Sequence, residues 1–413
     1  MKKTLFMLAV TGLALTSCSQ EDVVYVNHRN DDAITFRARM NRPTKAQDFT
    51  TENLDSFKVY GYLGDINEIE TEGPLTDYFK KAVEFKRDMT DNDNLSMYFT
   101  SDETYYWPND GSWFSFLAYA PSDLTGVSSN TNGELHFSNF EVNPDIEKQI
   151  DLIAEAGAGA KDPELDGWDE LFLYFKHALT KVYVSAAKNS NPEFDIEVAG
   201  VKISNIAMKG DCVFNGLSRE DDEIHFDWTP SSELGEVVYI FDNPVKIEED
   251  STPLMDRDAA NGSFLLIPQQ LLNDRKFTED SNMIAFNFKE GVAYISLLVR
   301  VVHTGSNAVM YPFKEGVEDI TETVDGKQYA WASFPVGSLW SAQRYVEYVV
   351  DFSRGLGYVA PGAREDLEYT TILGPEIRFT EEVAEWSEGL YSDVGESHVV
   401  DVDQRDVEDP FGE

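Results

Sequence analysis

Short runs in which hydrophobic and polar residues alternate dominate this sequence. Apolar residues alternate with acidic ones at 194–198, and the same period of two recurs at 284–288 and 345–352. Because successive side chains of a strand point to opposite faces, this period predicts β-strands with one buried face. Two further runs, 171–175 and 292–302, are apolar on both faces and predict central strands of packed sheets.

Turn-forming residues separate these runs. Clusters rich in Gly, Asn, Asp and Pro lie at 108–111, 128–133 and 325–326, and such clusters favour tight turns. Short strands at regular spacing predict an all-β fold built of β-sandwiches. The segment 145–156 fits either a helix or a strand, because its isoleucines recur at a spacing that also suits a helix.

The polar stretch 188–192 predicts a linker between two parts of similar size. We expect an N-terminal β-sandwich at 33–188 and a C-terminal β-sandwich at 189–390. Residues 391–413 are predicted to form an acidic tail.

The first residues have the features of an export signal. Two lysines precede an apolar run at 5–15, which is too short to span a bilayer. Small residues then precede Cys18, and this arrangement resembles the bacterial lipobox, in which the cysteine is lipidated and becomes the mature N-terminus. We therefore expect a signal peptide at 1–17, lipidation of Cys18 and an acidic tether at 18–32.

The chain of 413 residues carries 75 acidic and 33 basic side chains, for a formal net charge of −42. A surface this acidic repels phosphate, which argues against nucleic acid as a partner. It also disfavours anionic membrane surfaces, so we expect membrane contact only through the lipid on Cys18. Two cysteines are too few for a disulfide scaffold, and Cys212 is expected to be a small buried residue.

No arrangement of residues in the sequence indicates an enzyme. The six histidines show no metal-ligand or catalytic spacing, and His177 lies in an apolar run that favours a packed core histidine. The glycines of 355–357 resemble a dinucleotide fingerprint, but Pro361 follows where a helix is required. The acidic clusters 91–94 and 401–403 lack the EF-hand pattern and favour solvated loops. We predict no enzyme activity, no cofactor and no metal site.

Most tryptophans lie in or beside predicted strands, which favours core packing over stacking on sugar rings. The tryptophans in question are Trp107, Trp113, Trp228, Trp331, Trp340 and Trp386. Exposed tryptophans would suit an alternative function, a surface glycan-binding lipoprotein that does not polymerise.

Several segments together resemble the fimbrillin family, the structural subunits of type V pili in Gram-negative anaerobes. Their order agrees across nearly the whole chain behind the tether. The segments are 34–36, 54–60, 106–108, 113–121, 175–182, 201–207, 264–269, 345–352, 372–379 and Trp386.

The resemblance implies two tandem transthyretin-like β-sandwich domains of Greek-key topology, with roughly seven strands each. It implies export as a lipoprotein to the outer membrane and the cell surface. The implied partners are other pilus subunits, a trypsin-like maturation protease and a host protein or glycan receptor. In this family the protease cuts after an early basic residue. Loss of the first strand then opens a groove that a strand from a neighbouring subunit fills.

The segment 33–40 is the candidate for this removable strand. Arg39, Arg42 and Lys45 lie at its end and just behind it, and we favour cleavage after Arg39 or Lys45 because a proline follows Arg42. An open sandwich edge binds an added strand strongly, and repeated head-to-tail addition gives a filament. The tail 391–413 is too charged to fill an apolar groove by itself. The sequence does not separate stalk, tip and anchor roles.

Overall fold

The computed structural model describes residues 33–39, 53–88, 98–108, 110–160, 171–188, 193–216, 226–248, 251–255, 262–271, 291–352, 355–373 and 378–385. Nearly all regular structure in these ranges is β-strand, which confirms the predicted all-β class. The helical turns are α1 (Ile69–Glu72), η1 (Ile66–Glu68), η2 (Ile146–Lys148) and η3 (Glu318–Ile320). No helix in the described ranges has the length and hydrophobicity needed to cross a membrane.

The N-terminal strands form one sheet that bends around an aromatic core, here called the wrapped sheet. Its strands are β1 (Phe36–Arg39), β2 (Ser56–Leu63), β3 (Thr76–Asp77), β4 (Val83–Arg87), β5 (Tyr98–Ser101), β6 (Phe114–Ala120), β9 (Ile153–Gly159), β10 (Leu171–Tyr174) and β11 (Lys176–His177). The order is β10-β1-β5-β4-β2-β6-β9-β11, with β3 paired to β2. Because Phe175 alone separates β10 from β11, one continuous stretch of chain joins the two ends of this order.

The C-terminal strands form two sheets that share a hydrophobic core, which is the arrangement of a β-sandwich. The first sheet contains β13 (Phe194–Ala207), β16 (Leu234–Lys246), β19 (Tyr294–His303), β20 (Val309–Tyr311), β21 (Thr321–Val324), β22 (Lys327–Pro335) and β24 (Tyr358–Val359). The second contains β12 (Thr180–Ala187), β17 (Thr252–Pro253), β18 (Phe264–Leu266), β23 (Arg344–Asp351) and β25 (Arg378–Glu385).

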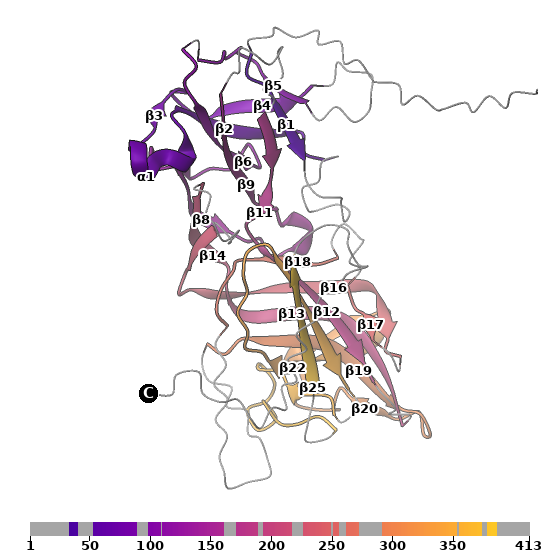
Figure 1. Cartoon of the computed structure of the whole chain (residues 1–413). Helices are drawn as coiled ribbons and strands as arrows, with labels where there is room; N and C mark the ends of the chain where they lie inside the picture. Colours follow the sequence, from indigo (N-terminus) through magenta and orange to yellow (C-terminus); the bar gives the residue numbers. More distant parts are fainter. Residues whose placement is uncertain are drawn as a thin grey trace, which may run out of the picture.

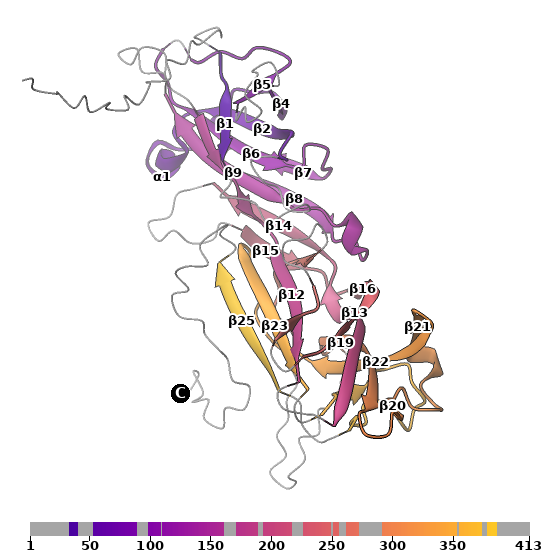
Figure 2. The same cartoon turned by 90° about the vertical axis from the view of Figure 1, so that its right-hand side faces the viewer.

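A fourth, smaller sheet, here called the joining sheet, connects the wrapped sheet to the sandwich. It has the order β15-β14-β8-β7, with β7 (Val127–Ser129), β8 (Glu134–Glu141), β14 (Lys209–Asn215) and β15 (Phe226–Pro230). β8 follows the wrapped sheet's β6 in the chain, whereas β14 follows β13 of the sandwich, and the two pair antiparallel. Figure 1 shows β8 and β14 between the indigo-to-purple wrapped sheet and the magenta-to-yellow sandwich, and Figure 2 shows the same order from the side.

Strand pairing therefore runs across the boundary predicted at 188/189. β12 precedes that boundary, yet it pairs in parallel with β23 along its whole length. β8 also precedes it and pairs with β14. The domain limits and the tandem transthyretin-like topology stay predictions, since pairing does not by itself define separately folding units.

Cys212 lies in β14, opposite Phe137 of β8 and Trp228 of β15. It is buried, as predicted, and burial raises the pKa of its thiol. A thiol held in its neutral form within the joining sheet packs as a small apolar residue.

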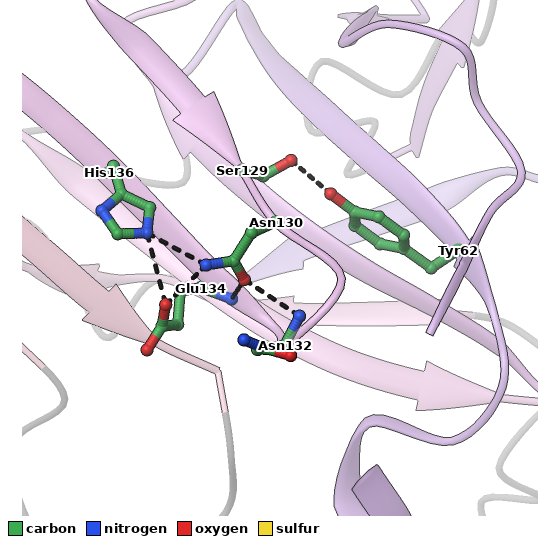
Figure 3. A network of polar contacts seen from close by, with 6 residues as sticks. All are labelled: Tyr62, Ser129, Asn130, Asn132, Glu134 and His136. Atoms are coloured by element: carbon green, nitrogen blue, oxygen red, sulfur yellow. Dashed lines mark hydrogen bonds and ion pairs between the residues drawn. The ribbon is translucent and has the colours of Figure 1, made fainter. Parts of the chain in front are cut away.

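Side-chain hydrogen bonds order the turn between β7 and β8 (Figure 3). Asn130 Oδ1 accepts from the backbone N–H groups of Asn132 and Glu134, at 3.0 and 3.2 Å, and its amide nitrogen donates to Glu134 at 2.6 Å. A hydrogen bond between the Tyr62 and Ser129 hydroxyls joins this hairpin to β2 of the wrapped sheet. The turn therefore sets where β8 enters the joining sheet.

The patterns predicted at 194–198, 292–302 and 345–352 lie within or overlap β13, β19 and β23. The segment 145–156, which fitted a helix or a strand, forms the single turn η2 and then enters β9. The side chain of Asp145 accepts from the backbone N–H of Glu147 at 3.1 Å, which starts that turn. The run 284–288 lies outside the described residues.

The run 171–175 was predicted to form a strand buried on both faces, and the structure buries only one. In β10, Leu171 and Leu173 are buried, but Phe172 is half-buried and Tyr174 is 55% exposed. The second face of β10 is apolar in sequence and still faces outward. In β6 of the same sheet, by contrast, both faces are buried, since Phe116 lies in the aromatic core and Tyr119 packs against Phe137 of β8.

Candidate functional site

β1 is inserted between two strands that are distant from it in sequence. On one side it pairs in parallel with β10, with Phe36 opposite Leu171 and Ala38 opposite Leu173. On the other side it pairs antiparallel with β5, where Phe36 lies opposite Phe99. In the sheet order, β5 and β4 separate β1 from β2, its successor in the chain.

The inward side chains of β1 fill the core of the wrapped sheet. Phe36 and Ala38 of β1, and Ile34 just before it, are each at most 2% exposed. The Phe36 ring meets Phe85 and Phe116 edge-on, with ring centres 4.7 and 5.1 Å apart. This alternation of buried and half-buried residues is that of a strand with one face in the core.

Without β1, two strand edges and an apolar trough would be open. β5 and β10 would lose the backbone pairing that β1 provides, and the rings around Phe36 would border an empty space. Unpaired edges beside an apolar surface bind added strands. The site is therefore a groove between β5 and β10 that the protein's own first strand occupies.

The predicted processing residues lie at the end of β1 or beyond it. Arg39 is the last residue of β1 and lies opposite Tyr174. Arg42, Lys45 and the predicted lipidation site Cys18 lie outside the described residues. Because β1 ends at Arg39 and β2 begins at Ser56, a cut after any of the three basic residues separates these two strands covalently.

A buried acid and a histidine connect β11 to the chain that enters β9. His177 Nδ1 donates to Asp151 Oδ2 at 2.7 Å, and both side chains are almost fully buried. His177 is thus the packed core histidine that the sequence predicted. The sequence did not indicate Asp151, because nothing in the local pattern distinguishes it from the many other acids of this chain.

Glu155 lies in β9 near the point where β10 passes into β11. Burial raises the pKa of its carboxyl to about 7, although the backbone N–H groups of Ala156 and Tyr174 and the charge of Lys176 oppose that rise. The Ala156 N–H donates to Glu155 Oε1 at 2.9 Å. The carboxyl therefore takes up a proton near neutral pH.

This raised pKa predicts a pH dependence of stability. Between its ordinary value of 4.5 and about 7, the Glu155 carboxyl binds more protons in the folded protein than in the unfolded chain. Its contribution to the free energy of unfolding therefore falls as pH rises through that interval. We expect Glu155→Gln to lose less stability than wild type between pH 5 and pH 8 in urea unfolding. Parallel profiles for the two proteins would contradict this.

The tryptophans and acidic clusters considered as glycan or metal sites are buried, partly exposed or outside the described ranges. Trp107, Trp331 and Trp340 are buried, and Trp228 is half-buried with Nε1 donating to the Ala178 carbonyl at 2.8 Å. Trp113 is 46% exposed. The clusters 91–94 and 401–403 and Trp386 are not among the described residues. Within the described ranges, no group of three or more His, Cys, Asp or Glu side chains is placed to hold a metal ion.

Comparison with known proteins identifies the family. The model of the family described as Fimbrillin-like matches residues 44–345, which is nearly three quarters of the chain, and the protein belongs to this family. The chain is similar to a fimbrial protein from Bacteroides vulgatus, with 14% identity, a TM-score of 0.49 and coverage of 85% of this chain and 99% of the other. It is also similar to a fimbrial assembly protein from Parabacteroides distasonis, with 10% identity, a TM-score of 0.38 and coverage of 86% and 98%. The search of curated proteins found no significant match.

Proposed function

We propose that this protein is a subunit of a cell-surface type V pilus, exported as a lipoprotein through Cys18 and assembled by strand exchange. In this mechanism a trypsin-like protease cuts behind β1, and β1 leaves its groove. A strand of a neighbouring subunit then takes its place. Membership of the Fimbrillin-like family supports the pilus role.

The position of β1 is the observation that carries the proposal. A strand of four residues contributes a buried ring to the centre of the core and pairs with β5 and β10. Its covalent link to β2 passes Arg42 and Lys45. After a cut there, noncovalent contacts hold β1 to the rest of the described structure, so an incoming strand can compete for the same groove.

An incoming strand would restore what the departure of β1 removes. It would pair with both open edges and bury its own apolar residues in the trough. Because the groove and the donated strand lie on different parts of each subunit, the contact is heterologous and repeats without closing. The product of such repetition is a filament.

Limited trypsin digestion of the protein without its signal peptide tests the proposal. We expect a shortened core that begins at Met40 or Ala46, followed by laddered oligomers on gels without strong denaturant. A variant with Arg39, Arg42 and Lys45 all replaced by Gln is the control, in which β1 should stay covalently joined to β2 and the protein should stay monomeric. Wild-type protein that stays monomeric after clean removal of β1 would refute strand exchange.

The N-terminal residue of the protein on cells distinguishes the pilus roles. A lipidated Cys18 would indicate an anchor subunit or a simple lipoprotein, because the first strand is then retained. A terminus at Met40 or Ala46 would indicate a polymerised subunit.

A further inference from the structure

The outer face of β1 carries a cation between two aromatic rings. Phe36 and Ala38 point into the core, so the alternation of a strand places Arg37 on the opposite face. The guanidinium carbon of Arg37 lies 4.2 Å from the centre of the Tyr98 ring and 5.6 Å from the centre of the Phe172 ring. Both distances are within the range of cation–π attraction.

The two rings belong to the two strands that border the groove. Tyr98 is in β5, directly opposite Arg37 in the antiparallel register, and Phe172 is in β10, directly opposite it in the parallel register. Phe172 also stacks on Tyr174, with ring centres 6.4 Å apart and planes 22° apart. Arg37 therefore connects both edges of the groove across its outer surface, while Phe36 fills its inner side.

We infer that the rings of Tyr98 and Phe172 form a cation slot, which retains β1 through Arg37 and favours incoming strands with Arg or Lys at the same register position. The partner that fits is a β-strand of another subunit with apolar inward residues and a cationic outward residue between them. This inference rests on the proposed strand exchange and adds to it a determinant of strand release and strand choice.

Register places the outward residue of any replacing strand in this slot. A strand that buries apolar residues at the positions of Phe36 and Ala38 must direct the residue between them outward, since a slip by one residue would exchange the two faces. Aromatic faces attract cations through their quadrupole. The net charge of −42 adds a negative field that disfavours a carboxylate in the same place.

The rate at which β1 leaves a nicked protein measures how strongly the cation slot retains it. A recognition site for a site-specific protease is inserted between Lys45 and Ala46 of the chain without its signal peptide, and the departure of the β1 fragment is followed after cleavage. We expect Arg37→Gln to release the fragment about tenfold faster than wild type. Arg37→Lys keeps the cation and should stay within about threefold of wild type.

A double-mutant cycle separates the slot from a general charge effect. Tyr98→Leu and Phe172→Leu are each combined with Arg37→Gln, and release rates are compared. If the slot operates, the effect of Arg37→Gln shrinks when either ring is absent, because the partner of the cation is already lost. Trp113→Leu is the matched control, since this exposed ring precedes β6, which β5, β4 and β2 separate from β1 in the sheet order. Effects that simply add for Tyr98 and Phe172 would overturn the inference.

Synthetic peptides test strand choice. Fluorescent peptides of residues 33–40 with Arg, Lys, Gln or Glu at position 37 are added to nicked wild-type protein, and their incorporation is measured. We expect the Arg and Lys peptides to enter about five- to tenfold better than the Gln peptide, and the Glu peptide to be poorest. Equal incorporation of all four peptides refutes the cation slot and leaves strand exchange standing. Failure of every peptide to enter, with β1 retained indefinitely, refutes strand exchange itself.

Discussion

Replacement of Phe36 by alanine is expected to lower the free energy of unfolding of the wrapped sheet by about 3–5 kcal/mol. The Phe36 side chain is fully buried and meets the rings of Phe57, Phe85 and Phe116 edge-on. Alanine would leave a cavity in the middle of this cluster, and rings held by rigid strands collapse into such a space only partly. Urea unfolding measures the loss, and hydrogen exchange at the β1 amides shows whether β1 detaches first.

Thr35→Ala is the matched control for this experiment. Thr35 neighbours Phe36 on the same short segment but is only half-buried. Its truncation should change the free energy of unfolding by no more than about 0.5 kcal/mol. Equal losses for the two variants would show that β1 contributes through its backbone pairing, and the buried ring would not be the determinant of its retention.

Replacement of Asp151 by alanine is expected to cost about 3 kcal/mol. Asp151 and His177 are both almost fully buried and share a hydrogen bond of 2.7 Å, so truncation removes that bond in a place that water does not reach. β11 should then exchange its amide hydrogens faster. Because β11 continues directly from β10, the same change should also loosen one edge of the groove around β1.

Two variants make the Asp151 experiment specific. Asp151→Asn keeps an oxygen that can accept from His177, so it should lose clearly less stability than alanine. Asp102→Ala removes a carboxylate that pairs with Lys86 at 3.0 Å but is 84% exposed, and it should change stability little, as exposed ion pairs usually do. Similar losses for Asp151→Ala and Asp102→Ala would contradict the role assigned to the buried pair.

Local patterns in the sequence indicated much of this molecule. The alternation at 194–198 and 345–352 predicted strands that lie within or overlap β13 and β23. The apolar setting of His177 predicted its burial. These inferences succeeded because a period of two and a run of apolar residues report directly on which side chains leave water.

The same patterns did not indicate which strands lie side by side. Nothing local in 134–141 and 209–215 shows that β8 and β14 pair across the molecule. The run 171–175 predicted a strand covered on both faces, whereas only one face of β10 is buried. An apolar residue favours burial, but whether its face of the strand is buried depends on strands from distant parts of the chain that pack against it.

The sequence by itself therefore determined the β character of the chain, its acidity, its family resemblance and the identity of the first strand as a separate element. Tertiary structure alone decided that this strand lies between β5 and β10, that Asp151 meets His177, and that Arg37 lies between Tyr98 and Phe172. The reason is physical. Face and period are properties of neighbouring residues, whereas pairing and register arise from contacts between segments that are far apart in the chain.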